Sequence, residues 1–359
     1  MADFETLLGL VSHYSPSGGE RAAAEWLTAR MQTLGYDRSF IDEAGNAVGI
    51  LGQGSRQAVL LGHIDTVPGE IPVRRDQAGG ASPVLYGRGA VDAKGPLACF
   101  VDAAAQVGRT DDWQFVVIGA VEEERDSQGA RFAAQRYRPA FAIIGEPNHW
   151  DRLGLGYKGS AAARIRVTCR EAHPASGEPT AAEAAVEVWL AIESHARAYN
   201  AGKPRVFDHI LPSLRELRSG RDEFEQWASL DVGMRLPTGL SPEAWYGRLR
   251  ELAGATRAGS VVVEPTGFSV PAWTCEKNTP LVRAFLAGIR AQGGEPRFVY
   301  KTGTADLNIV APAWGCPAVV YGPGDSSLDH TPDEHLALDD YARAVSVLRQ
   351  VLSRLARTD

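Results

Sequence analysis

The stretch Gly62-His63-Ile64-Asp65-Thr66-Val67 follows directly on the apolar run Ala58-Val59-Leu60-Leu61. A short apolar run of this kind is typical of a buried strand. His63 and Asp65 are two residues apart, so both side chains would lie on the same side of that strand. An imidazole and a carboxylate together suit zinc, or another borderline divalent ion such as cobalt. The stretch therefore predicts a sheet that carries a metal ligand at one edge.

The same arrangement recurs along the chain. Apolar runs at 115–120 and 141–144 predict further buried strands, and acidic residues follow each of them. In α/β sheets ligands bind at the carboxyl ends of the strands, so these acidic residues are expected to meet there. Taken singly, each candidate also fits a surface residue or an ordinary turn, but their joint placement favours a metal site. In chain order the candidates are His63, Asp65, Asp92, Glu122, Glu123, Glu124, Glu146 and His330.

The bulk properties are those of an ordinary globular protein. The 359 residues are 44% hydrophobic and 23% charged, which argues against long disordered stretches. The formal charge of −7 gives no general basic footprint for nucleic acid. No apolar run approaches the roughly 20 residues that span a bilayer, and the first residues lack the features of a signal peptide. Four scattered cysteines without a CxxC pair are expected to be buried free thiols, and a cytoplasmic protein with no membrane partner is expected.

The pattern of elements predicts two domains. Strand and helix patterns alternate over the first part of the chain, which predicts an α/β fold with a mainly parallel sheet and helices on both faces. Half-exposed strands and helices, typical of a small α+β domain, follow, with a polar stretch over 202–221. The predicted architecture is a catalytic domain of residues 1–156 plus 271–359, with a ferredoxin-like α+β domain of residues 157–270 inserted.

Two features point to chemistry with two metal ions. Asp92 lies in the glycine-rich segment Gly87-Arg88-Gly89-Ala90-Val91-Asp92-Ala93-Lys94-Gly95, and one carboxylate can bridge two cations about 3.5 Å apart. An ordinary Gly-Asp turn is the alternative, whereas a phosphate-binding loop is disfavoured because the third glycine is missing. The triplet Glu122-Glu123-Glu124 fits a solvated helix face, or a cluster whose repulsion a cation relieves. In the second case one glutamate binds metal and its neighbour takes a proton from water.

The ordered motifs resemble the co-catalytic zinc aminoacylase and carboxypeptidase family. They are HxD, GRGxxDxKG, a Glu-Glu pair before Gly129-Ala130, a Gly-Glu-Pro element and a late histidine, and they cover nearly the whole chain. The resemblance implies an amide hydrolase with two Zn2+ ions per subunit, for which Co2+ can substitute. It implies five metal ligands: His63 and Glu146 for one ion, Glu124 and His330 for the other, and Asp92 between them.

The resemblance also assigns residues that do not bind the metal. It implies that Glu123 is the general base and that Asp65 orients His63. The spacing to Gly129 matches the family only if Glu122 lies outside the functional pair. A cis peptide bond after Asp92 is a further implication.

The insert resembles the family's lid or dimerisation domain, which implies a homodimer. His173 matches a histidine that reaches the partner subunit's active site and stabilises the oxyanion, although judged alone it is a loop residue. Arg235 matches an arginine that binds a substrate carboxylate. A glycine-rich loop with Lys301, Gly303 and Thr304 corresponds to a segment beside the substrate, where Lys301 has an equally good structural interpretation.

Within the family, the chain most resembles enzymes that act on a small amino-group carrier protein, LysW. These enzymes hydrolyse the amide that links lysine, or in some organisms ornithine, to the side chain of its C-terminal glutamate, in lysine and arginine biosynthesis. The acidic net charge stands against this substrate, because a carrier with clustered carboxylates favours a basic docking surface. A small-molecule acetylornithine or acetyl-lysine deacetylase, or a peptidase, shares the same metal chemistry. A non-catalytic metal-binding scaffold and a two-metal phosphoesterase are less favoured.

Overall fold

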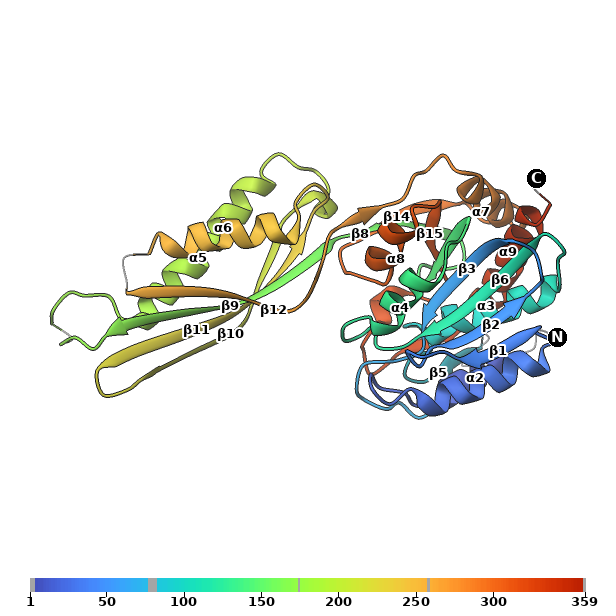
Figure 1. Ribbon diagram of the computed structural model, residues 1–359, viewed down its shortest axis with the longest axis horizontal. Coiled ribbons are helices and arrows are strands. Elements are labelled where there is room, and N and C mark those ends of the chain that lie inside the picture. The colour runs from blue at the N-terminus through green and yellow to red at the C-terminus, as the bar shows by residue number, and fades with distance from the viewer. Residues whose placement is uncertain (1–3, 77–82, 174, 257–258, 358–359) are drawn as a thin grey trace. The chain divides into compact units, whose positions relative to one another are not determined.

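The computed structural model describes residues 4–76, 83–173, 175–256 and 259–357 (Figure 1). These residues form two compact units. Unit 1 comprises Met1–Gly156, Cys275–Tyr300 and Ala305–Asp359. Unit 2 comprises Tyr157–Thr274 and Lys301–Thr304. The candidate metal ligands all lie in unit 1, so unit 1 carries the site described below.

The main sheet of unit 1 has a parallel centre. Its strand order is β1-β2-β6-β3-β7-β15-β8, with β14 pairing with β8. The pairs β6–β3, β3–β7 and β7–β15 are parallel, whereas β1–β2, β2–β6 and β15–β8 are antiparallel. The prediction of a mainly parallel sheet is therefore confirmed. The strands are β1 (Arg38–Ile41), β2 (Ala47–Leu51), β3 (Arg56–His63), β6 (Trp113–Ala120), β7 (Phe141–Gly145), β8 (Arg152–Tyr157), β14 (Arg297–Lys301) and β15 (Ala318–Tyr321).

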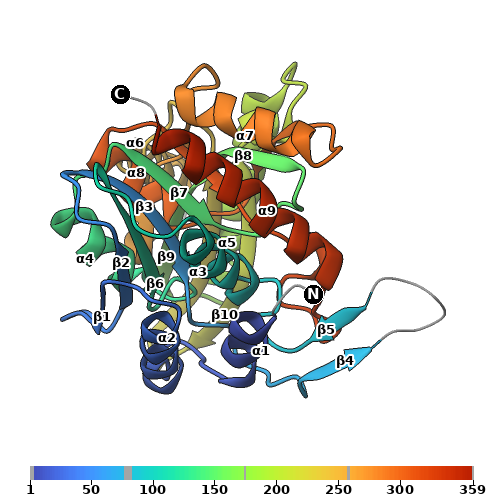
Figure 2. The same ribbon diagram turned by 90° about the vertical axis from the view of Figure 1, so that its right-hand side faces the viewer.

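Helices cover both faces of this sheet. Figure 2 shows α3 and α9 in front of the strands, and Figure 1 shows α4 and α8 on the opposite side of β3 and β6 from α3. Helix α3 packs on α1 and α9, and α9 also packs on α7, while α4 packs on α8. The helices are α1 (Glu5–Ser12), α2 (Arg21–Thr33), α3 (Lys94–Val107), α4 (Gln128–Arg136), α7 (Pro280–Ala291), α8 (Leu307–Trp314) and α9 (Leu338–Leu355).

A row of glycines lets α3 approach the sheet just below the ends of the parallel strands. Gly62 of β3 lies opposite Gly119 of β6 and Gly145 of β7. A Cβ atom at Gly145 would lie 2.9 Å from Phe100 of α3, and one at Gly119 would lie 3.1 Å from Leu97. Larger residues would push the helix outward. The glycines thus hold the start of α3, and the loop before it, close to the strand ends.

A small sheet lies beside the loop that precedes α3. Its strand order is β16-β5-β4, and both pairs are antiparallel. The strands are β4 (Arg74–Asp76), β5 (Val84–Tyr86) and β16 (His335–Ala337). A short 3-10 helix, η2 (Ser326–Leu328), precedes β16. Pairing of β5 with β16 brings the segment before Asp92 next to the segment after His330.

Unit 2 is a four-stranded antiparallel sheet with two helices packed on it. The strand order β10-β11-β9-β12, with the chain order strand, helix, strand, strand, helix, strand, is ferredoxin-like. The fold predicted for the insert is therefore confirmed. Its elements are β9 (Gly159–Arg170), α5 (Ala181–Asn200), η1 (Val206–Asp208), β10 (Leu211–Arg221), β11 (Glu225–Leu236), α6 (Pro242–Gly254), β12 (Ser260–Val270) and β13 (Trp273–Thr274).

One strand of unit 2 departs from the sequence prediction. The polar stretch 202–221 contains β10, which pairs with β11 along the edge of the sheet. Most β10 side chains are exposed or half-buried, so this strand lacks the apolar alternation that marks its neighbours. An edge strand is held in the sheet mainly by backbone hydrogen bonds, and these do not require a pattern of apolar residues in the sequence.

Two further predictions concern the state of the cysteines and the absence of a membrane-spanning segment. All four cysteines are free, as predicted. Cys99 and Cys169 are buried, whereas Cys275 and Cys316 are half-buried, so the prediction of burial was wrong for two of them. Among the described residues, no helix is long and apolar enough to cross a bilayer.

A buried lysine gives unit 2 a testable pH dependence. Lys158 donates hydrogen bonds to the backbone carbonyls of Phe207 and His209, and burial lowers its pKa to about 8. The unfolded chain therefore holds this proton up to a higher pH, and folding stability rises as pH increases from 8 toward the ordinary lysine value.

We expect wild type to gain up to about 3 kcal/mol relative to Lys158→Met between pH 8 and pH 10.5. Urea unfolding of both proteins, followed by circular dichroism across this range, measures the difference. If the free energy of unfolding of the two proteins changed with pH in parallel, the expectation would be contradicted.

Candidate metal centre

Neighbouring strands deliver the candidate ligands to one edge of the sheet. His63 is the last residue of β3, Glu146 follows β7, and Glu123 and Glu124 follow β6 closely. His330 lies in the segment after β15. Because β6, β3, β7 and β15 are adjacent and parallel, their carboxyl ends meet at one place. The apolar runs of the sequence had predicted β3, β6 and β7, and the strand order brings the ligands together.

Asp92 lies between two histidines, with one oxygen toward each. Its Oδ1 is 3.2 Å from Nε2 of His63, and its Oδ2 is 3.0 Å from Nε2 of His330. His330 Nε2 is also 3.0 Å from Glu124 Oε1. The peptide bond between Asp92 and Ala93 is cis, as the resemblance implied. The carboxylate thus has the placement that a ligand shared by two cations requires.

The candidate residues form three overlapping groups that could hold a metal ion. Within each group, one ligand atom per residue lies within 4.8 Å of the others. His63, Asp92 and Glu124 each occur in two groups, so the groups merge into one cluster. The groups are His63 with Asp92 and Glu146, Asp92 with Glu124 and His330, and His63 with Glu123 and Glu124.

Asp65 lies behind the cluster and contacts both sides of it. Its Oδ1 is 3.4 Å from Nδ1 of His63, the ring nitrogen turned away from Asp92. Its two oxygens also accept the backbone N–H groups of Glu123 at 3.0 Å and Glu124 at 3.1 Å, and Oδ2 accepts from the Ser17 hydroxyl at 2.7 Å. Sequence reasoning had linked Asp65 only to His63. The structure adds that Asp65 fixes the backbone of the glutamate pair.

Glu122 differs from the other two members of the triplet in its backbone and its partner. Its backbone is left-handed, with φ 61°, and its carboxylate pairs with Arg125 at 2.6 Å. Glu122 belongs to none of the three ligand groups. The geometry therefore brings Glu123 and Glu124 into the cluster and leaves Glu122 outside.

The charges in the cluster fit a cation. Burial raises the pKa of Glu123 and of Glu146 well above the ordinary value, and neighbouring carboxylates raise both further. Hydrogen bonds to Asp92 and Glu124 raise the pKa of His330 to about 10. Burial lowers the pKa of His63, but its bonds to Asp65 and Asp92 reverse this and raise it well above the ordinary value. Without a metal, these groups retain or gain protons to offset their crowded negative charge. Two imidazoles with several buried carboxylates are donors suited to zinc.

Asp306 is a buried acidic residue that the sequence prediction did not single out. It precedes α8, and it is 1% exposed. Burial raises its pKa to about 7, while His63 and Ser127 lower it. Its position in the segment Thr302-Gly303-Thr304-Ala305-Asp306 was the available signal, but nothing in the pattern distinguished this aspartate from a helix-capping residue.

The remaining predicted site residues lie in unit 2. Arg235, near the end of β11, donates a hydrogen bond to the Thr304 hydroxyl at 2.8 Å. The backbone carbonyl of Lys301 accepts from the N–H of Lys158, and Gly303 borders open space. His173 is exposed after β9, and its Nδ1 accepts the N–H of Ala175 at 3.1 Å. Arg235 and the 301–304 segment are thus one group, and His173 lies on a separate loop.

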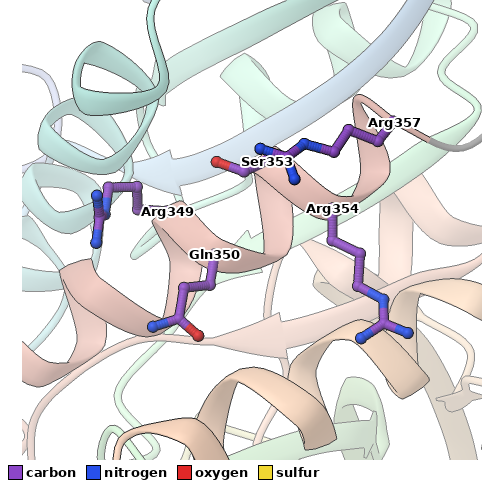
Figure 3. Close-up of a pocket in the computed structure, with 5 residues that line it drawn as sticks. All are labelled: Arg349, Gln350, Ser353, Arg354 and Arg357. Atoms are coloured by element: carbon purple, nitrogen blue, oxygen red, sulfur yellow. The ribbon is translucent and has the colours of Figure 1, made fainter.

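A separate hollow of about 370 Å³ runs along the last turns of α9 (Figure 3). Its lining offers no carboxylate, imidazole or thiol, so it cannot hold the cation discussed above. Basic residues are favourable at the C-terminal end of a helix because they offset its dipole. The lining residues are Arg349, Gln350, Ser353, Arg354 and Arg357.

The sheet, the inserted ferredoxin-like unit and the histidine-carboxylate cluster together define a metal-dependent hydrolase. The chain belongs to the peptidase family M20/M25/M40, whose model matches residues 59–354. A solved M20 family metallo-carboxypeptidase from Sulfolobus solfataricus has the same fold, with a TM-score of 0.71, 16% identity and coverage of 100% of both chains.

Curated relatives narrow the comparison. The chain is 43% identical to the "[LysW]-lysine hydrolase" of Deinococcus radiodurans, covering 98% of this chain and 96% of that one. It is 39% identical to the "putative [LysW]-lysine/[LysW]-ornithine hydrolase" of Thermococcus kodakarensis, covering 98% of this chain and 91% of that one. The similarity therefore extends over both units.

Proposed function

We propose that this chain releases lysine, and also accepts ornithine, from the C-terminal glutamate side chain of the carrier protein LysW. The observation that carries the proposal is the 43% identity to a [LysW]-lysine hydrolase over nearly the whole of both chains. The reaction is the hydrolysis of a linear amide, in lysine biosynthesis and, with ornithine, in arginine biosynthesis. Four free cysteines fit a reducing compartment, so we place the reaction in the cytoplasm.

The metal centre of the proposal contains two zinc ions, which Co2+ can replace. His63 and Glu146 would hold one ion, Glu124 and His330 the other, and Asp92 both. Bound zinc lowers the pKa of water and polarises a carbonyl oxygen. The two oxygens of Asp92 face different histidines at 3.2 and 3.0 Å, which supports its role as the shared ligand.

Glu123 is the proposed general base and acid. It takes a proton from the attacking water and delivers that proton to the nitrogen of the departing amine. The place of Glu123 in the cluster and the anchoring of its N–H by Asp65 support this role. A base held in one position by its backbone is ready for both transfers without reorganisation.

Residues of unit 2 take the proposed binding roles. Lysine linked through an amino group keeps a free carboxylate, which the guanidinium of Arg235 would bind as a forked donor. Thr304 accepts from Arg235 and would hold that fork in place. Gly303 and Lys301 would lie beside the substrate. The imidazole of His173, supplied by the partner subunit, would donate to the carbonyl oxygen as it becomes negative.

A side-by-side assay tests the proposed substrate. The zinc-loaded protein is incubated with LysW-lysine, LysW-ornithine, acetyl-lysine, acetylornithine and dipeptides, and the released amino acids are measured by mass spectrometry. We expect kcat/KM for LysW-lysine to exceed that for each free substrate by at least about 100-fold, equivalent to about 3 kcal/mol of additional transition-state binding. Faster turnover of an acetylated amino acid or a dipeptide would assign the chain to the alternative substrate class.

We further propose that the protein is a homodimer and that residues 157–270 form its lid or dimerisation domain. Strand β10 lies at one edge of the unit 2 sheet, and Leu217 on it is 41% exposed. Helix α5 packs on β10 and leaves Val186 45% and Leu190 51% exposed. An exposed strand edge with neighbouring apolar side chains suits pairing with a second copy about a two-fold axis.

Leu190→Arg is therefore expected to convert the dimer to a monomer. Light scattering after size-exclusion chromatography measures the mass. Zinc content should remain, while turnover falls because His173 can no longer reach the partner's site. Val262→Arg is the control, since Val262 is a similarly exposed side chain on β12, at the opposite edge of the sheet. A fully active Leu190→Arg monomer would contradict the role of His173 in the partner's site.

A further inference from the structure

A buried ion pair lies directly behind the metal cluster. Arg88 Nη1 is 2.9 Å from Glu334 Oε2, and the two residues are 7% and 0% exposed. An ion pair gives up its hydration on burial, and it is tolerated only when the remaining donors and acceptors are also satisfied. The partners of those remaining atoms therefore show what the pair does.

The second oxygen of Glu334 holds the loop that carries Asp92. Glu334 Oε1 accepts the backbone N–H of Val91 at 2.9 Å and that of Asp92 itself at 3.0 Å. Two consecutive N–H groups that converge on one oxygen fix the local backbone direction. The carboxylate of Glu334 thus fixes the position of the Asp92 backbone, from which its side chain extends.

The remaining donors of Arg88 reach two other ligand-bearing loops. Nε donates to the carbonyl of Gly69 at 2.8 Å, in the loop that follows His63 and Asp65. Nη1 also donates to the carbonyl of Thr331 at 3.1 Å, in the residue directly after His330. One planar guanidinium therefore binds the loops of both histidines together with Glu334.

We propose that Arg88 and Glu334 are positioning residues for the metal centre. Their ion pair ties together the loops of His63, Asp92 and His330, and so holds the Asp92 carboxylate between the two imidazoles. The inference rests on the metal centre of the proposed function, but not on the identity of the substrate. Neither residue belongs to a ligand group. Glu334 accepts the backbone N–H of Asp92, and Arg88 binds backbone carbonyls in the loops that carry the two histidines.

The test compares zinc affinity in variants that keep the side-chain size. Metal-free wild type, Glu334→Gln and Arg88→Lys are titrated with Zn2+ in a calorimeter, with circular dichroism to verify folding. Gln keeps an acceptor for the two N–H groups but removes the charge, and Lys keeps the charge but cannot reach three partners. We expect each variant to bind zinc about 10–100-fold more weakly, the effect typical of groups that orient metal ligands.

Asp102→Asn is the matched control. Asp102 is also a buried carboxylate of unit 1 that accepts two side-chain donors, Thr6 at 2.5 Å and Tyr341 at 2.7 Å. Thr6 lies in α1 and Tyr341 in α9, outside the ligand-bearing loops, so substitution of Asp102 should lower the melting temperature without changing zinc affinity. Because Arg88 and Glu334 act through one pair, the double variant should bind zinc no more weakly than the worse single variant.

The zinc titrations test the positioning role independently of the proposed substrate. Wild-type zinc affinity in folded Glu334→Gln and Arg88→Lys would overturn the positioning role, as would an equal loss in Asp102→Asn. A wild-type protein that binds zinc but leaves LysW-lysine intact would contradict the proposed substrate, and the zinc comparison would still decide the positioning role. On the preferred substrate, we expect the variants to lose kcat with little change in KM, because neither residue touches the substrate.

Discussion

Glu123→Gln should abolish most of the turnover while leaving the zinc in place. The substitution keeps the shape of the side chain and removes its capacity to accept a proton. General base catalysis contributes typically about 10²–10⁴-fold, so we expect kcat to fall by that factor. Steady-state kinetics on the preferred substrate, together with zinc content by elemental analysis, measures the effect.

The neighbouring glutamate provides the control. Glu122→Gln changes the same residue type one position earlier, but the Glu122 carboxylate pairs with Arg125 outside the cluster. Its kcat should stay within about threefold of wild type, since a change at a partly exposed pair outside the site is worth less than about 1 kcal/mol. A large loss of kcat in Glu122→Gln together with an active Glu123→Gln would show that Glu122, and not Glu123, is the general base.

Asp92→Ala should remove the metal centre as a whole. Asp92 lies 3.2 Å from the imidazole of His63 and 3.0 Å from that of His330, so its loss removes a ligand from each proposed ion. We expect zinc affinity to fall by more than about 100-fold, beyond the range for groups that only orient ligands. Calorimetric titration of the metal-free protein measures the affinity, and turnover should fall below detection.

Asp325→Ala tests whether any acidic residue nearby has the same effect. Asp325 lies in the segment that carries His330, but its Oδ1 accepts the N–H of Ser327 at 2.9 Å and caps a short helix. Zinc affinity should remain near that of wild type. Tight binding of two zinc ions by Asp92→Ala would rule out the shared-ligand role.

The strands that carry the ligands were predictable because each is a short, fully buried apolar run. The runs at 58–61, 115–120 and 141–144 all became parallel strands of one sheet. Strand β10 was not predictable in the same way, since its side chains are largely exposed. Burial leaves a trace in hydrophobicity, whereas backbone pairing at an exposed edge does not.

The metal ligands could be predicted from the sequence because they follow these buried strands, whereas the residues that hold the ligands in place could not. Histidines and acidic residues at the ends of predicted strands indicated a metal site. The family resemblance then implied which of these residues bind each ion. The anchoring of Glu123 and Glu124 by Asp65, and of the Asp92 loop by Glu334, left no local signal. Arg88 and Glu334 are 246 positions apart, and the pairing of β5 with β16 brings their segments together. Such contacts depend on tertiary structure.

The position of β15 has a consequence for synthesis on the ribosome. This strand is made near the end of the chain, yet it lies between β7 and β8, which are made much earlier. Until residues 318–321 emerge, the nascent sheet has an apolar edge at β7 with no neighbour, which is a hazard for aggregation. The continuous part of unit 2, residues 157–274, is complete before then. We therefore expect unit 2 to fold first and ribosome-bound chains to depend on chaperones until the last strand of the main sheet is released.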